Sequence, residues 1–225
     1  KACLEVTVGV EGAVDLRIQR RYNPEGLTAY NIVPGLMGVI LTMTLIMMTG
    51  LAIARERERG TFENLLAMPV RPLEIMIGKL VPYILVAYVQ VGVILVAAHV
   101  LFAVPILGSL WLLLACTLAF IIANLSVGLL FSTLARNQMQ AMQMTFFFFL
   151  PSMLLSGFMF PFRGMPDWAQ AIGEMLPLTH FLRIVRGILL KVNGPADVWP
   201  NLWPLLAFTL VVVALGAKRF RKTLD

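Results

Sequence analysis

Charged residues are scarce in this sequence, and its long apolar runs contain no Asp, Glu, Lys or Arg. Of the 225 residues, 13% are charged and 59% are hydrophobic, whereas soluble domains average about 25% charged residues. This composition is typical of a membrane protein. Ion-coupled carriers and proton relays usually place ionisable groups near the membrane centre, so the absence of such groups argues against both classes.

Motifs of catalysis and metal binding are absent too. The sequence has no Gly-x-x-x-x-Gly-Lys-Ser/Thr phosphate loop, no Gly-x-Gly-x-x-Gly, no Cys-x-x-Cys and no His-Glu-x-x-His. Cys3 lies in a polar segment and Cys116 in an apolar run, so we do not expect them to pair. His99 and His180 are far apart in a chain with few carboxylates. We therefore predict no catalytic residue, no bound cofactor and no metal in this chain.

Five apolar runs each approach the roughly 20 residues that a helix needs to cross a bilayer. They are residues 31–54, 80–103, 110–134, 141–160 and 199–217. We expect an all-α polytopic membrane protein with five transmembrane helices, forming a transmembrane domain over residues 30–225.

Residues 1–29 have a different pattern. Apolar and polar residues alternate from Leu4 to Glu11 and again from Val14 to Gln19, which is typical of half-buried strands. This predicts a partial β or α/β segment, the remnant of an extracytoplasmic domain whose other part is missing.

The basic residues predict an orientation. They gather on alternate connections, as the positive-inside rule requires. The rule places residues 1–30 outside, 55–79 inside, 104–109 outside, 135–140 inside and the C-terminal tail inside. The connection 161–198 is an exception, because it carries four basic residues on the outside, but long loops weigh less in this rule. An outside N-terminal segment predicts one further span upstream, which makes six in the intact chain.

The polar segment Arg55–Lys79 interrupts two apolar runs. Alternating Arg and Glu from Arg55 to Arg59 extend a helix out of the membrane, and Gly60 and Thr61 end it and cap a new one. The short helix 61–68 places Phe62, Leu65 and Leu66 on one side. The segment is either a basic anchor on the lipid headgroups or a docking site for a partner, and its shape favours docking.

Two other sets of residues are candidate sites. Prolines open two short amphipathic helices in 161–198, which we expect to re-enter the outer leaflet. Mild polar and aromatic residues in the third and fourth runs are either a substrate path or interhelical packing, and packing is favoured. These possible path residues are Asn124, Ser126, Phe146 and Phe149.

The polar segment resembles the cytosolic loop of ABC-2 type permeases, the membrane subunits of one class of bacterial ABC exporter. The resemblance lies in Arg-Glu-Arg-Glu-Arg-Gly-Thr at 55–61, Pro-Val-Arg-Pro at 69–72 and Gly-Lys at 78–79, and weaker matches extend along the chain. The drug-export-like subgroup is the most similar, although this chain lacks the family's first span.

The resemblance implies a permease dimer, homo- or heteromeric, in the bacterial inner membrane. Each half would contact a separate ATP-binding subunit that holds ATP and Mg. Residues 61–68 would be the coupling helix, and helices in 161–190 would form the outer gate. The implied coupling residues are Arg59, Gly60, Thr61, Phe62, Glu63, Leu65, Leu66, Pro69, Arg71 and Pro72, and the implied gate residues are Pro161, Pro166, Pro177 and Phe181. The implied cargo is a hydrophobic or amphiphilic compound leaving the cytoplasm.

Two other functions remain open on the sequence. One is an ATP-independent channel or carrier, which would give flux from this protein alone. The other is a membrane assembly scaffold, which would bind a partner other than an ATPase.

Overall fold

The computed structural model describes residues 29–58, 72–105, 107–191 and 193–221. Throughout these ranges the regular structure is helical, without a strand. The elements are α1 (Ala29–Glu58), α3 (Pro72–Phe102), α4 (Leu110–Leu134), α5 (Gln138–Leu155), the 3₁₀ turn η1 (Phe162–Gly164), α6 (Asp167–Glu174), α7 (Pro177–Lys191) and α8 (Pro195–Arg221). The predicted β segment and the helix 61–68 lie outside the described residues.

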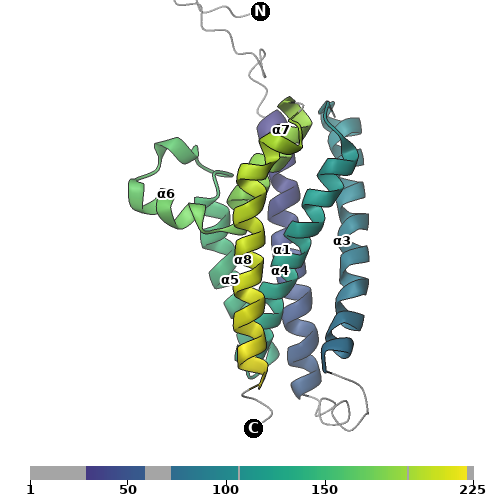
Figure 1. Cartoon of the computed structure of the whole chain (residues 1–225), viewed down its shortest axis with the longest axis vertical. Coiled ribbons are helices and arrows are strands. Elements are labelled where there is room, and N and C mark those ends of the chain that lie inside the picture. The colour runs from purple at the N-terminus through teal and green to yellow at the C-terminus, as the bar shows by residue number, and fades with distance from the viewer. Residues whose placement is uncertain (1–28, 59–71, 106, 192, 222–225) are drawn as a thin grey trace, which may run out of the picture.

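Long helices run along one axis of the molecule, with α1 and α4 at the centre (Figure 1). Helix α1 contacts α3, α4, α5 and α7, while α4 also contacts α7 and α8. Helix α6 projects from the side of the bundle, and α7 lies at its upper end (Figure 1). The chain therefore forms a helical bundle with α6 at its side and α7 at its upper end (Figure 1).

Four helices are long and apolar enough to cross a membrane: Ile32–Glu56, Leu80–Phe102, Leu110–Leu134 and Pro195–Gly216. This is the architecture of a multi-pass membrane protein. Four of the five predicted spans thus have a counterpart among the described residues. The fifth, 141–160, corresponds to α5, which is not among these candidates.

The C-terminal boundary predicted for that run is wrong. Helix α5 ends at Leu155, and residues 156–160 form turns and bends. Gly157 has φ +80°, a left-handed conformation that ends a helix and favours glycine. The helix also begins earlier than predicted, at Gln138, with three glutamines in its first two turns that make it less apolar.

The ends of the helices alternate between the two ends of the bundle. The lower end holds the end of α1, the start of α3, the α4–α5 connection and the end of α8 (Figure 1). The upper end holds the α3–α4 connection and α7 (Figure 1). The predicted orientation needs this alternation. Which end faces the cytosol stays a prediction.

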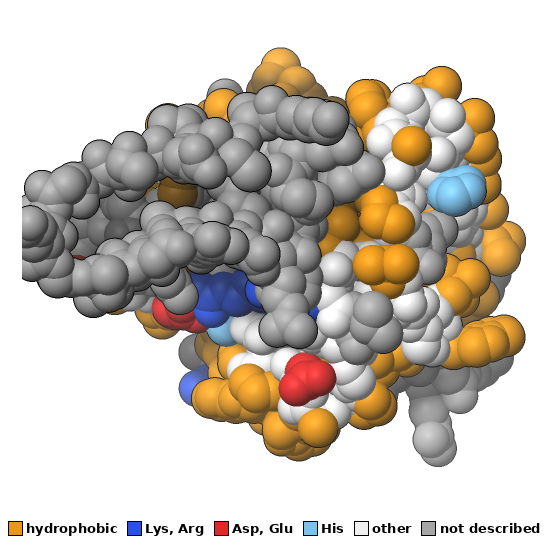
Figure 2. Space-filling view, turned by 90° about the horizontal axis from the view of Figure 1, so that it is seen from above, with side chains coloured by type: hydrophobic (Ala, Val, Ile, Leu, Met, Phe, Trp, Pro, Cys, Tyr) orange, Lys and Arg blue, Asp and Glu red, His pale blue; other side chains and the backbone are white. Residues whose placement is uncertain are grey.

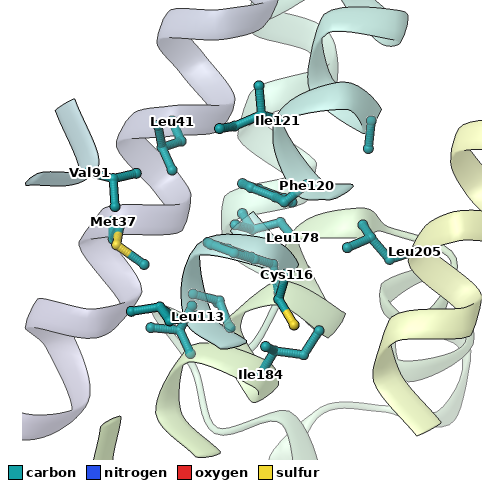
Figure 3. Close-up of a cluster of buried hydrophobic side chains, with 14 of the residues drawn as sticks. Met37, Leu41, Val91, Leu113, Cys116, Phe120, Ile121, Leu178, Ile184 and Leu205 are labelled. Carbon is teal, nitrogen blue, oxygen red and sulfur yellow. The ribbon is translucent and has the colours of Figure 1, made fainter. Parts of the chain in front are cut away.

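The core lies where α7 meets α1, α4 and α8 (Figure 3). Phe120 of α4 stacks on Phe181 of α7, with ring centroids 3.9 Å apart and planes 1° from parallel. Met37 and Leu41 of α1 and Leu205 of α8 are fully buried in the same cluster. The sequence predicts one apolar stripe on α7, whereas α7 is buried on nearly every side and even Thr179 is inaccessible.

Candidate functional site

Most of the predicted coupling residues lie outside the described residues, from Arg59 to Arg71. Pro72 is described and begins α3, a position that proline tolerates because the first turn of a helix has no intrahelical partner for its N–H. The structure therefore describes the two helices on either side of this segment.

The last residue of α1 is bound to the first residue of α5. One carboxylate oxygen of Glu58 accepts a hydrogen bond from the backbone N–H of Gln138 at 2.7 Å, and the other accepts from Gln138 Nε2. Helix N-termini leave backbone N–H groups without intrahelical acceptors, and they favour negative charge. The hydrogen bonds from Gln138 hold the pKa of Glu58 below its ordinary value.

The connection before α5 is fixed by a second set of hydrogen bonds. Asn137 caps the helix, its Oδ1 accepting from the backbone N–H of Gln140 at 2.7 Å. The side chain of Gln140 in turn accepts from the backbone N–H of Arg136 at 2.8 Å. The start of α5 is therefore held both by its own cap and by Glu58.

Helices α1, α4 and α5 approach closely near the middle of the bundle. A Cβ added to Gly128 of α4 would lie 2.8 Å from Thr49 Cβ and 2.9 Å from the Ile46 carbonyl oxygen of α1. The hydroxyls of Thr49 and Thr145 donate to carbonyls of their own helices, at 2.8 and 2.9 Å. Small residues, and hydroxyls that already hydrogen-bond within their own helix, allow membrane helices to pack closely.

The possible path residues do not share one surface. Asn124 is fully buried in α4 and donates to the Phe120 carbonyl oxygen, while Ser126 donates to Ile122. Two residues along a helix are about 200° apart, so these side chains leave α4 in different directions. On α5, Phe149 is buried and Phe146 is exposed. Of these four residues Phe146 alone is exposed, and whether they form a path or serve packing stays a prediction.

The possible gate residues lie on the helix pair at the upper end. Pro161 precedes η1, Pro166 caps α6 and Pro177 opens α7. Phe181 is fully buried against Phe120, so it packs α7 onto α4. A gating movement of α7 would have to separate these rings or carry α4 along.

An ion pair ties α6 to α7 at this end. Arg183 donates two hydrogen bonds to the Glu174 carboxylate, at 2.6 and 2.9 Å, and its guanidinium lies 4.7 Å above the Phe162 ring. These hydrogen bonds lower the pKa of Glu174 from its ordinary value. His180 adds a contact of 2.8 Å between Nε2 and the Glu174 carbonyl oxygen. Seen from above, basic atoms adjoin acidic and histidine atoms on this face (Figure 2).

Sequence reasoning missed both of these polar contacts. Glu58 and Gln138 are 80 residues apart, and Glu174 and Arg183 belong to different helices. A signal for the first contact exists in the sequence, namely Glu58 at the end of one predicted helix and Asn137-Gln138 at the start of another. Within the described ranges no group of three or more His, Cys, Asp or Glu could hold a metal ion.

Comparison with known proteins gives the chain a family. The model of the ABC-2 family transporter proteins matches residues 10–218, nearly the whole chain. This chain belongs to the ABC-2 family. The resemblance read from the cytosolic loop motif is thereby confirmed.

The ABC-2 chain has several named relatives. It is 35% identical over 208 residues to the probable multidrug ABC transporter permease YbhR of Escherichia coli, covering 92% of this chain and 56% of the relative. It is 36% identical over 217 residues to the inner membrane transport permease YhhJ of the same organism, covering 95% and 58%. With the linearmycin resistance permease protein LnrN of Bacillus subtilis it shares 24% identity over 199 residues, covering 88% and 51%. The ABC-2 chain thus spans about half the length of the curated relatives it matches.

Proposed function

We propose that this chain is the main transmembrane part of a permease subunit in an ATP-driven exporter. The observation that carries the proposal is that α1 and α3 are continuous helices from their membrane spans to the two ends of segment 59–71. A force applied to that segment would therefore reach two spans without passing through a flexible joint. The ABC-2 family and the permease names of the relatives support the same function.

ATP and Mg belong, in this proposal, to a separate ATP-binding subunit that docks on residues 61–68. Closure of the ATPase pair moves the segment, and rigid helices convert the movement into a change of access. Glu58 transmits the displacement to α5 through Gln138, and the close contact at Gly128 transmits it to α4. The buried Phe120–Phe181 stack then passes it to α7 at the outer end.

The complete transmembrane unit is a dimer of permeases in the bacterial inner membrane. We infer that α5 is a fifth crossing. Its exposed apolar side, which includes Phe146 and Phe147, is open to lipid or to the partner permease, while its first turns carry glutamines. In this proposal a sixth span and an extracytoplasmic domain, of which residues 1–29 are the predicted remnant, complete each permease. Hydrophobic or amphiphilic compounds are the proposed cargo, in line with the word "multidrug" in the name of YbhR.

The coupling function can be tested with the permease co-purified with its ATP-binding subunit in proteoliposomes. Phe62→Asp combined with Leu66→Asp places two charges on the proposed docking side, and we expect dye-stimulated ATP hydrolysis to fall to the unstimulated rate. Asn64→Asp is the control, because it adds one negative charge on the opposite side of the predicted helix. Undiminished stimulation in the double variant would contradict the docking role. Dye flux through the permease alone would favour a channel or carrier instead.

A further inference from the structure

Arg186 is a partly buried cation without a partner anion among the described residues. It lies in the middle of α7, a helix in contact with α1, α4 and α8. The carboxylates of Glu174 and Asp197 are already engaged, one with Arg183 and the other with the backbone N–H of Gly194. Burial lowers the pKa of Arg186 from its ordinary value, and desolvation is the cause.

The guanidinium has unused hydrogen-bonding capacity. Nη1 donates to the carbonyl oxygen of Gly157 at 3.3 Å. Nε is buried and has no hydrogen-bond partner in the described part of the chain. Arginine carries five N–H donors in a planar fork that matches carboxylate and phosphate groups. A partly buried charge without a counter-charge loses some of its hydration, so an anion at this position would be stabilising.

Three elements meet around this guanidinium. Gly157 belongs to the turn after α5, and Gly35 belongs to α1. A Cβ added to Gly35 would lie 3.4 Å from Arg186 Nη2 and 2.6 Å from the ring of Phe158. The charge and the aromatic ring thus lie side by side over the same glycine. A ligand that combines an anionic group with an apolar tail would satisfy both.

We propose that Arg186 binds the anionic headgroup, a phosphate or a carboxylate, of an amphiphile at the upper end of the bundle between α1, α7 and the turn after α5. The other arginine of this face, Arg183, is unsuited to the role because Glu174 occupies its fork. The inference concerns binding alone and goes beyond the proposed function, since it holds whether or not an ATPase drives the chain. The amphiphile is either a transported compound or an outer-leaflet lipid.

The test measures the binding of decyl phosphate to the protein in phosphatidylcholine nanodiscs. Wild-type protein should bind it saturably, and Arg186→Gln should weaken the affinity about tenfold or more, the ratio expected for the loss of one charge-assisted hydrogen bond. Arg186→Lys keeps the charge and should retain more of the affinity than Arg186→Gln. Decanol, which has the same tail without the charge, should show no dependence on residue 186. Equal binding of decyl phosphate by wild-type and folded Arg186→Gln protein would overturn the proposal.

A second measurement needs no variant. Phenylglyoxal modifies accessible guanidinium groups, and peptide mass spectrometry gives the extent at Arg186. Decyl phosphate should protect Arg186 from modification where decanol does not, and equal modification with both would overturn the proposal even if Arg186→Gln fails to fold. Nanodiscs that contain phosphatidylglycerol separate the two sources. Competition with decyl phosphate in wild-type protein assigns the site to a lipid headgroup, and the absence of competition assigns it to a free amphiphile.

Discussion

Glu58 accepts hydrogen bonds from both the backbone nitrogen and the side-chain nitrogen of Gln138. The last residue of α1 is therefore fastened to the first residue of α5, beside the segment proposed to receive force from an ATPase. Both residues are at the surface, where hydrogen bonds and charges contribute little to stability. The contact therefore adds little to the stability of the bundle, and its proposed role is to link the end of α1 to the start of α5.

The first prediction is that Glu58→Ala lowers dye transport per ATP hydrolysed while the unfolding temperature stays nearly unchanged. Gln138→Ala should lower it less, because the backbone N–H of residue 138 still donates to Glu58. The double variant should be no worse than Glu58→Ala alone, because Glu58→Ala already removes both hydrogen bonds. The measurement is the ratio of transport to hydrolysis in proteoliposomes. Met139→Ala, at an exposed neighbouring position, is the control. Strictly additive losses would show that the two residues act independently.

The second prediction concerns the contact between α1 and α4. Gly128→Ala would bring its Cβ within 2.9 Å of a backbone oxygen that cannot yield easily, and we expect a destabilisation of about 1–3 kcal/mol. Gly92→Ala on exposed α3 meets nothing within 4 Å, so it should be neutral or slightly stabilising. Unfolding in a detergent titration gives both free energies. A Gly128→Ala protein as stable as wild type would mean that α1 and α4 are farther apart than described.

The third prediction concerns the aromatic stack in the core. Phe181→Ala removes a fully buried ring from the face of Phe120 and should destabilise the protein by about 3 kcal/mol. Phe147→Ala removes the same side chain from a position that is 80% exposed, so a change below about 0.5 kcal/mol is expected. Similar losses in the two variants would argue against the burial of α7.

The fourth prediction is a pH dependence from the Glu174–Arg183 pair. The pKa of Glu174 is lowered in the folded protein, chiefly by the hydrogen bonds from Arg183. The stabilisation is therefore fully present above the unfolded pKa and is lost as the pH falls through the folded pKa. Wild type should exceed Glu174→Gln in unfolding temperature at pH 7, and this advantage should shrink below about pH 5.

The size of that advantage is small, since the carboxylate is 45% exposed and such pairs contribute about 1 kcal/mol or less. The measurement is the unfolding temperature of both proteins from pH 4 to pH 8. A difference that stays constant over this range would show that the carboxylate is not paired in the folded protein.

Much of the architecture follows from the composition of single helices. Apolar runs without charge predict membrane helices, and prolines such as Pro166 and Pro177 predict the starts of short ones. The α5 boundary was harder, because Gly157 ends the helix through its left-handed conformation inside a run that still reads as apolar. Hydropathy measures the free energy of transferring side chains to lipid, so it does not show where a glycine turns the backbone and ends a helix.

The polar contacts could not be predicted because they join residues of different helices, whose relative placement the sequence does not state. In the sequence Arg186 belongs to the polar side of an amphipathic helix, whereas in the structure α1 and the turn after α5 partly cover it. Phe181 reads as a gate residue, yet its ring lies on Phe120. Residues 59–71 carry the most specific motif in the chain, and their predicted coupling role rests on sequence and family alone.

The central claim is that this chain moves its cargo only when a separate ATPase drives it. The direct measurement is ethidium accumulation in inside-out vesicles that contain the permease, with and without its ATP-binding subunit. Accumulation should require both proteins and ATP, and should be lost in the Phe62→Asp, Leu66→Asp permease while Asn64→Asp retains it. Accumulation that persists without the ATP-binding subunit would contradict the account.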